Sequence, residues 1–541
     1  MKLFKLTLLL ITTLQLHAQL AITMPGDFEK QNGLLLAWSD NMDVNLVTTL
    51  IISEVQQTTD SIWLLYQSNS PTMDSLSISA FITSHGATLD NIYYVPSNYE
   101  TNQIRNFLPG IGYATFDAGL QRFMYNSEYS QGGTPAEDSI AAQLATLFNF
   151  PLAEIPIVTN GSDLLHDGMK NGFSTRNMLY NNPTYTENQV KLILEDAFNL
   201  NNWIFLEPLL NSGGGADFSI DNFMQIIDFE TVIFSSYPDS LPDYPILEQN
   251  VTEVEGLLNA FGQPYTIYRI PAAPLDDGQY PSQPEDEIRT YTNALIVNEL
   301  VFIPSYGLQP YDSVAKAIYR SAMPGYEVIP VVANLLTQQF GSLKSLAMPI
   351  PQANYLRIEH KKLTGIQTFQ PEIQITCISK AGDLVEEMWL YYKINQDTNY
   401  TKTPVYLVCP EHFGKIEGIS ITDTVSYYIE AISTRTTTTY PLAAPEGNFT
   451  FWFDPILEMQ ESGSHETVLY PNPGNGSFRL KLGNKMAEAE VRIFDMDGRI
   501  LFHDKVTGYE QVILNKSIAT GLYLVQVITH DNNEIIRLIV E

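Results

Sequence analysis

Cysteine is almost absent from this chain, which carries only Cys377 and Cys409 among its 541 residues. Residues 1–376 contain no thiol, so chemistry that needs a cysteine nucleophile or a cysteine metal ligand is excluded there. In an exported protein the two thiols could form a disulfide. Two buried free thiols on neighbouring strands are the alternative.

Basic residues are also scarce. The chain has 29 lysines and arginines against 61 aspartates and glutamates, a formal net charge of −32. The electrostatic field of so negative a protein repels phosphate backbones and anionic lipids, and we expect no nucleic acid as a partner. A cationic ligand fits this balance better, although most surface acids only keep a protein soluble.

Metal and nucleotide motifs are missing as well. The eight histidines are scattered and form no H-x-x-x-H or H-E-x-x-H pattern, and no C-x-x-C occurs. The glycine-rich residues 213–218 lack the lysine and the spacing of a phosphate loop. We therefore expect no metal and no cofactor, and expect the acidic residues 276–278 and 285–287 to be solvated loops.

Only one long apolar run is present, at the N-terminus. MKLFKLTLLLITTLQLHAQ carries Lys2 and Lys5 before the run and small residues after it. This pattern predicts a signal peptide over residues 1–18. The run is shorter than the roughly 20 residues that a membrane anchor needs, and we expect no transmembrane segment.

Residues 19–355 alternate strand-like and helix-like patterns, which predicts an α/β domain with degenerate internal repeats. The expected strands are 33–38, 61–66, 231–236, 265–270 and 299–304, and the expected helices are 44–57, 137–148, 187–199 and 312–323. Helical patterns are missing from residues 356–456, where short strands separated by turns predict a β-sandwich. Residues 457–467 are polar and predict a linker.

The last unit, residues 468–541, combines short strands with glycine and asparagine turns. It carries YPNP at 470–473, DMDGR at 495–499 and GLYLVQV at 521–527. In these motifs it resembles the C-terminal sorting domain of proteins exported by the bacterial type IX secretion system. The resemblance implies that this unit engages the secretion machinery, and that the protein crosses the outer membrane to be released or held at the cell surface.

Three segments of the α/β domain carry a second resemblance: MPGDFEKQNGLLLAWSD (24–40), YTNALIVNELVFIPSYG (291–307) and AMPGYEVIPV (322–331). They resemble the Porphyromonas-type peptidylarginine deiminases and the related agmatine deiminases. The resemblance implies a five-bladed pseudo-symmetric α/β propeller, the pentein fold. An Ig-like β-sandwich and a small all-β sorting domain would follow it.

The family's chemistry makes clear demands on its site. Two carboxylates hold a planar guanidinium cation, a thiolate attacks its carbon, and a histidine moves protons. At the matching positions this chain has Asn106 for the first acid, Ser219 for the histidine and Ser345 for the cysteine. Asp221, at the second acid, and Asn293 are retained. The family mechanism therefore lacks its nucleophile, its base and one binding acid.

Further candidates lie close to these positions. Asp163 and His166 fall near the expected site entrance and could contact a ligand. Asp221 could hold a cation, cap a turn or pair with Arg105. Lys344 could act as a base for Ser345, but neighbours on an extended strand point to opposite faces.

Three functions remain open from the sequence. The leading hypothesis is a secreted pseudoenzyme that binds a ligand, for example a guanidino or arginine-containing cation. The second is an active hydrolase of C–N bonds in peptidyl-arginine, agmatine or related guanidino compounds, working through Ser345 or a water. The third is an adhesin or surface-assembly protein that acts through the Ig-like domain.

Overall fold

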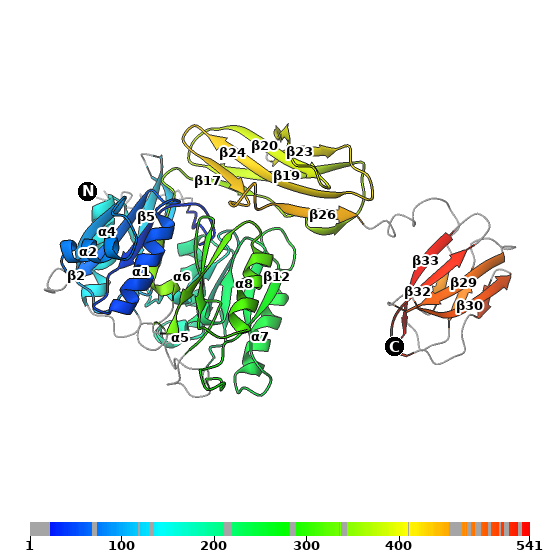
Figure 1. Ribbon diagram of the computed structural model, residues 1–541, viewed down its shortest axis with the longest axis horizontal. Helices are drawn as coiled ribbons and strands as arrows, with labels where there is room; N and C mark the ends of the chain where they lie inside the picture. Colours follow the sequence, from blue (N-terminus) through cyan, green and yellow to red (C-terminus); the bar gives the residue numbers. More distant parts are fainter. Residues whose placement is uncertain are drawn as a thin grey trace, which may run out of the picture.

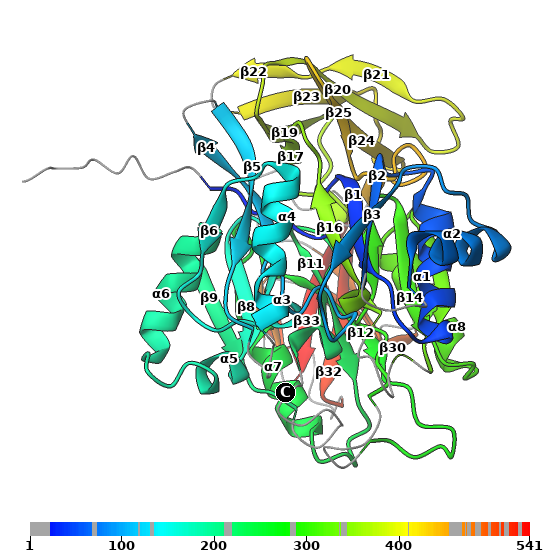
Figure 2. The ribbon, with the colours of Figure 1, turned by 90° about the vertical axis from the view of Figure 1, so that its left-hand side faces the viewer.

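The computed structural model describes most of the chain after residue 21 (Figures 1 and 2). The described residues are 22–67, 73–116, 119–129, 135–209, 219–281, 288–334, 336, 343–408, 411–453, 468–470, 472, 478–481, 488–495, 499–507, 510–512, 519–528 and 533–540. The expected signal peptide, the expected linker and Cys409 lie outside the described residues.

Residues 23–351 contain, in their described part, five small sheets built on one pattern. A central strand has an antiparallel neighbour on one side and a parallel neighbour on the other. In chain order of their central strands, the sheets are β16 (Ala347–Pro351), β1 (Gln31–Ala37), β2 (Ser61–Gln67) and β3 (Ile92–Ser97); β4 (Ile111–Phe116), β5 (Gly119–Asn126) and β6 (Leu152–Glu154); β7 (Leu165–His166), β8 (Asn171–Thr175) and β9 (Asn202–Leu206); β10 (Met224–Ile226), β11 (Thr231–Ser236) and β12 (Thr266–Pro271); and β13 (Leu295–Val297), β14 (Leu300–Ser305) and β15 (Glu327–Val332).

A helix connects each central strand to its parallel neighbour, because a parallel pairing needs a long crossover. These helices are α1 (Met42–Val55), α4 (Ile140–Phe148), α6 (Glu187–Phe198), α7 (Tyr244–Glu255) and α8 (Tyr311–Ala322). The described helices α2 (Ser75–Ser84), α3 (Pro135–Asp138) and α5 (Asn177–Tyr180) complete this part. The strand–helix–strand unit is the internal repeat at which the sequence hints.

The residue types explain these elements. Central strand β11 has the sequence TVIFSS and is buried over Thr231–Ser235, as expected for a strand covered on both faces. Helix α6 begins with a capping box between Thr186 and Gln189 and buries Val190 and Leu194. The strands and helices predicted from periodicity are confirmed, with ends that differ by a few residues.

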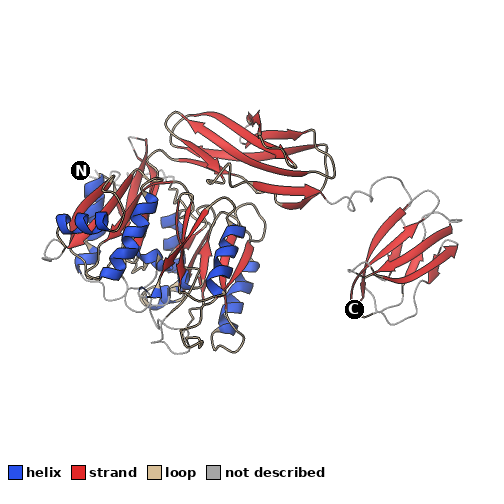
Figure 3. Ribbon diagram, viewed as in Figure 1, coloured by secondary structure: helices blue, strands red, loops and turns tan. Residues whose placement is uncertain are grey.

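Residues 356–453 are β-rich, and none of the described residues after Leu346 is helical (Figure 3). One sheet has the order β17-β19-β23-β22, and the other has the order β18-β26-β24-β20-β21, with β25 paired to β24. The bounds are β17 (Leu356–Glu359), β18 (Gly365–Gln367), β19 (Glu372–Ala381), β20 (Val385–Ile394), β21 (Thr401–Pro404), β22 (Tyr406–Val408), β23 (Glu411–Glu417), β24 (Thr424–Ser433), β25 (Thr437–Tyr440) and β26 (Phe449–Phe453).

The core of this β-rich region is continuous with the core of the α/β part. Phe229 of the α/β part packs on Tyr440 of β25, with ring centroids 5.7 Å apart.

The described strands after residue 467 form a separate β unit with a core of its own. Its two sheets have the orders β27-β28-β31 and β30-β29-β32-β33. The bounds are β27 (Val468–Tyr470), β28 (Arg479–Lys481), β29 (Glu488–Phe494), β30 (Ile500–Thr507), β31 (Glu510–Val512), β32 (Gly521–Ile528) and β33 (Asn533–Val540). Among the described residues, no helix is both long and apolar enough to span a membrane.

Candidate functional site

A short turn precedes the antiparallel outer strand of each of the five sheets, and the sequence-predicted site positions lie on these turns. Asn106 lies on the turn before β4, and Asp163 lies in η1 (Gly161–Asp163) before β7. Asp221 lies in η3 (Ile220–Asn222) before β10, Asn293 precedes β13, and Ser345 lies in η4 (Lys344–Leu346) before β16. Equivalent turns of the repeated units thus supply these five positions, whereas the candidate His166 lies on β7 itself.

The first two turns touch through their backbones. The Gly161 amide donates to the Asn106 carbonyl at 2.9 Å. A Cβ on Gly161 would lie 2.0 Å from the Arg105 carbonyl oxygen, so only glycine allows this approach. The Ser162 hydroxyl then donates to Asn106 Oδ1 at 2.5 Å. Asn106, for which the family resemblance implies an acid, is thus held by neutral partners.

Asp163 fastens the second turn to the third. Its Oδ1 accepts the Ile220 and Thr175 amides, both at 3.0 Å, and its Oδ2 accepts the Thr175 hydroxyl at 2.9 Å. Burial raises the pKa of Asp163 to about 7, against the lowering effect of these hydrogen bonds. Both oxygens of this substrate-binding candidate are therefore engaged within the protein.

Asp221 is fully buried in η3. Its Oδ1 accepts the Ser219 hydroxyl at 2.8 Å. Burial raises the pKa of Asp221, while the positive charges of Lys344 and Arg105 and a contact with Asn293 favour its ionised form. Ser219, the residue expected at the histidine position, is therefore a hydrogen-bond donor to Asp221.

Lys344 is a buried lysine at the centre of this group, with 1% of its surface exposed. Its Nζ lies 2.9 Å from Gln225 Oε1 and 3.1 Å from Asp27 Oδ2, and its backbone amide donates to Asn293 Oδ1 at 2.7 Å. Burial lowers the pKa of Lys344, and the charges of Asp27 and Asp221 oppose this.

The extended conformation expected around Ser345 is wrong. Lys344–Leu346 form the 3-10 turn η4, and β16 begins only at Ala347. The Ser345 carbonyl accepts the Arg105 amide at 3.1 Å, and Ser345 is buried.

Asp27 belongs to the candidate site in the structure, although no sequence motif predicts it there. Arg105 Nη2 lies 2.6 Å from Asp27 Oδ2, so the Arg105–Asp221 pair considered from the sequence is replaced by a pair with Asp27. Burial raises the pKa of Asp27, but the charges of Arg105 and Lys344 outweigh it and hold that pKa well below its usual range. Asp27 lies in the segment MPGDFE, residues 24–29, which carries the family resemblance.

His166 lies on β7, beside the charge group formed by Asp27, Arg105 and Lys344. Burial lowers the pKa of His166 to about 4, although the charges of Asp27 and Asp167 raise it. The imidazole is therefore neutral at neutral pH.

This neutral histidine predicts a loss of stability in acid. The unfolded chain takes up the proton near the ordinary value of 6.5, whereas the folded chain takes it up only near pH 4. Between these values the unfolded state binds more protons, so stability falls as pH falls. In His166→Asn this loss should be smaller by on the order of 1–3 kcal/mol. Urea unfolding of both proteins at pH 7 and pH 4.5 measures it, and equal pH dependence would contradict the assignment.

The described thiol, Cys377, lies outside this site, on a strand of the β-rich region. Cys377 is a buried free cysteine on β19, and Cys409 lies outside the described residues. Burial raises the pKa of Cys377 to about 12, which makes it a poor nucleophile. Within the described ranges, no group of three or more His, Cys, Asp or Glu side chains is placed to hold a metal ion.

Space at the charge group is small. The cavity lined by Asp27, Arg105 and His166 has a volume of about 40 Å³, far below the roughly 300–1,000 Å³ of small-molecule sites.

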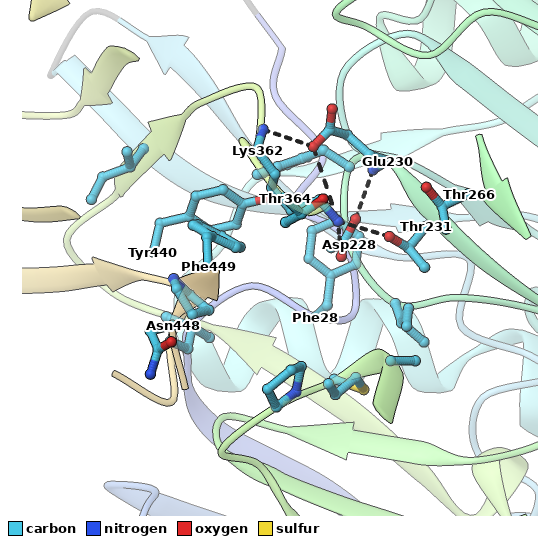
Figure 4. A pocket seen from close by; sticks show the side chains of 18 of the residues that line it. Phe28, Asp228, Glu230, Thr231, Thr266, Lys362, Thr364, Tyr440, Asn448 and Phe449 are labelled. Carbon is cyan, nitrogen blue, oxygen red and sulfur yellow. Dashed lines mark hydrogen bonds and ion pairs between the residues drawn. The ribbon is translucent and has the colours of Figure 1, made fainter. Parts of the chain in front are cut away.

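A larger pocket of about 710 Å³ lies where the α/β part meets the β-rich region (Figure 4). Phe28, Tyr440 and Phe449 form part of its wall, and Lys362 Nζ spans Asp228 Oδ2 at 2.7 Å and Thr231 Oγ1 at 2.8 Å.

Comparisons with known proteins agree with this architecture. Residues 23–351 match the family model of the Porphyromonas-type peptidyl-arginine deiminases, and residues 468–541 match that of the secretion system C-terminal sorting domain. A putative agmatine deiminase of Vibrio parahaemolyticus is 25% identical over 233 residues, which cover 40% of this chain and 64% of that protein. An agmatine deiminase of Pseudomonas fluorescens is 26% identical over 260 residues, covering 44% and 67%.

Solved structures share the fold at low identity. A putative arginine deiminase from Porphyromonas gingivalis superposes with a TM-score of 0.52 at 19% identity, over 61% of this chain and 99% of that one. An agmatine deiminase of C. jejuni with substrate bound gives a TM-score of 0.51 at 15% identity, over 62% and 97%.

Proposed function

Because this chain belongs to the Porphyromonas-type peptidyl-arginine deiminase family, we propose that it is a pseudoenzyme, a member that keeps the fold without the catalytic activity. One observation carries the proposal: residues 1–376 contain no cysteine, and Ser345 occupies the position expected for the thiol. Ser219 stands for the expected histidine at the start of the turn that carries Asp221, and Asn106 stands for the expected acid on the turn before β4.

The contacts of Lys344 also argue against a serine hydrolase. The Lys344 ammonium donates to Gln225 Oε1 and pairs with Asp27. These contacts favour its protonated form, in which it cannot accept the proton of Ser345. A serine hydroxyl is a weak nucleophile unless an adjacent base removes its proton.

The proposed architecture is a five-bladed α/β propeller over residues 19–355, an Ig-like β-sandwich over 356–456, a linker over 457–467 and the sorting domain. The repeated strand order and the equivalent turns support the propeller. The sorting domain at residues 468–541 indicates export to the cell surface or secretion, as the sequence predicts.

Ligand binding by this pseudoenzyme is proposed for the pocket of Figure 4. Its volume of about 710 Å³ lies within the range of small-molecule sites, roughly 300–1,000 Å³.

A product assay tests the loss of activity. The purified mature chain should release no ammonia or citrulline above background from agmatine, free arginine or arginine peptides, because losing nucleophile or base costs roughly 10⁶-fold in a comparable hydrolase. An active agmatine deiminase at equal concentration is the positive control. Turnover that Ser345→Ala abolishes would instead establish a serine-dependent hydrolase.

A further inference from the structure

We infer that Lys344 acts as a built-in ligand: its ammonium fills a cation site formed by Asp27, Gln225 and Asp221, which a small alkylammonium ion enters when the side chain is shortened. This inference deepens the proposed function and rests on it: in a pseudoenzyme of this family, the Lys344 side chain would occupy the site where a cationic ligand would otherwise bind.

The burial of Lys344 is the first argument. Its side chain is 2% exposed, and an ammonium removed from water is very costly unless charged and polar partners receive it. Asp27 Oδ2 at 3.1 Å and Gln225 Oε1 at 2.9 Å are those partners. The Asp221 carboxyl acts on the ammonium electrostatically and favours its charged form.

The site is built by the fold rather than by the lysine. Asp27 is also fixed by Arg105, at 2.6 Å. Asp221 is fixed by the Ser219 hydroxyl, at 2.8 Å, and Gln225 belongs to strand β10 and is fully buried. The acceptors therefore stay in place when the lysine side chain is removed.

Charge and volume then define what the emptied site takes. Lys344→Ala removes three methylene groups and one ammonium group, which correspond in number and kind to the atoms of propylammonium. The acceptors favour a cation with N–H donors over a neutral molecule of the same size. In the natural chain the Lys344 ammonium already occupies Asp27 Oδ2 and Gln225 Oε1, so a guanidinium cation would meet a like charge at these acceptors.

The test uses the full mature chain, its Lys344→Ala variant and two probes, propylammonium chloride and 1-propanol. Near-saturating propylammonium should raise the Tm of Lys344→Ala by roughly 2–4 °C, and calorimetry should detect its binding. 1-Propanol should have no such effect, and neither probe should shift the Tm of the natural chain.

Lys170→Ala is the matched control, because Lys170 Nζ donates to the Asn259 carbonyl at 3.2 Å and forms no ion pair with a carboxylate of the described residues. It should not respond to propylammonium. If Lys344→Ala does not fold alone, the readout is its refolding yield in each probe. Rescue by the amine and not by the alcohol supports the inference, and rescue by neither overturns it.

This outcome is separate from that of the product assay. Propylammonium binding by Lys344→Ala would stand even if the natural chain proved active. An inactive natural chain whose Lys344→Ala variant ignores the amine would overturn the built-in ligand and leave the pseudoenzyme in place.

Discussion

Asp27→Asn is expected to lower the free energy of unfolding by roughly 3–5 kcal/mol, the range found when a buried ion pair loses one partner. Asp27 serves two cations at once, Arg105 at 2.6 Å and Lys344 at 3.1 Å. The side chains of Arg105 and Lys344 are only 7% and 2% exposed, whereas that of Asp27 is 24% exposed, so water replaces the carboxylate only in part. Asparagine keeps the shape of the Asp27 side chain but removes its negative charge. Arg105 and Lys344 then keep Asp221 as an acid that interacts with both of them.

Urea unfolding measures this loss, and an exposed ion pair provides the control. Arg176 and Glu187 lie 2.9 Å apart with side chains 33% and 54% exposed. Glu187→Gln should therefore cost about 1 kcal/mol or less. A cost for Asp27→Asn no larger than that of the control would mean that Arg105 and Lys344 do not depend on Asp27.

The fold was predictable wherever the local pattern agreed with the tertiary environment. The run TVIFSS became β11, and the helical pattern beginning at Glu187 became α6. Helix α2 does not follow from the local pattern, because SLSISAFITS alternates apolar and polar residues in part, as a strand does. Its helix depends on Asp74, which caps the Leu76 and Ser77 amides, and on the burial of Ile78 and Ile82.

The site was predictable only in part, because motif order locates residues but not their long-range partners. Motif order identifies Asn106, Asp221, Asn293 and Ser345 as site positions, but it does not predict the short turns that carry them, and Ser345 lies in η4 rather than on the expected extended strand. The partner of Arg105 lies 78 residues away and that of the Lys344 ammonium 119 residues away. No local pattern encodes such pairs, and Asn293 holds the Lys344 backbone across 51 residues.

Arg357→Met is expected to cost roughly 3–5 kcal/mol as well, again by the loss of one partner from a buried pair. Arg357 lies on β17, where the β-rich region begins, and its side chain is 2% exposed. Its guanidinium donates to both Glu29 oxygens, at 2.7 and 2.6 Å, and to the Gly168 carbonyl at 3.0 Å. Glu29 and Gly168 belong to the α/β part, so this single side chain ties the two regions together.

Arg357→Lys separates charge from geometry. It keeps the positive charge but cannot reproduce the planar two-pronged contact with Glu29, so its cost should fall between zero and that of Arg357→Met. Lys415→Met is the exposed control, because Lys415 and Glu372 lie 2.7 Å apart with side chains 48% and 44% exposed. Calorimetry of the variants adds a second readout: if Arg357 couples the regions, its removal should separate their unfolding transitions, whereas Lys415→Met should leave them merged. A small cost without separation would show that the shared apolar core around Phe229 and Tyr440 holds the regions together by itself.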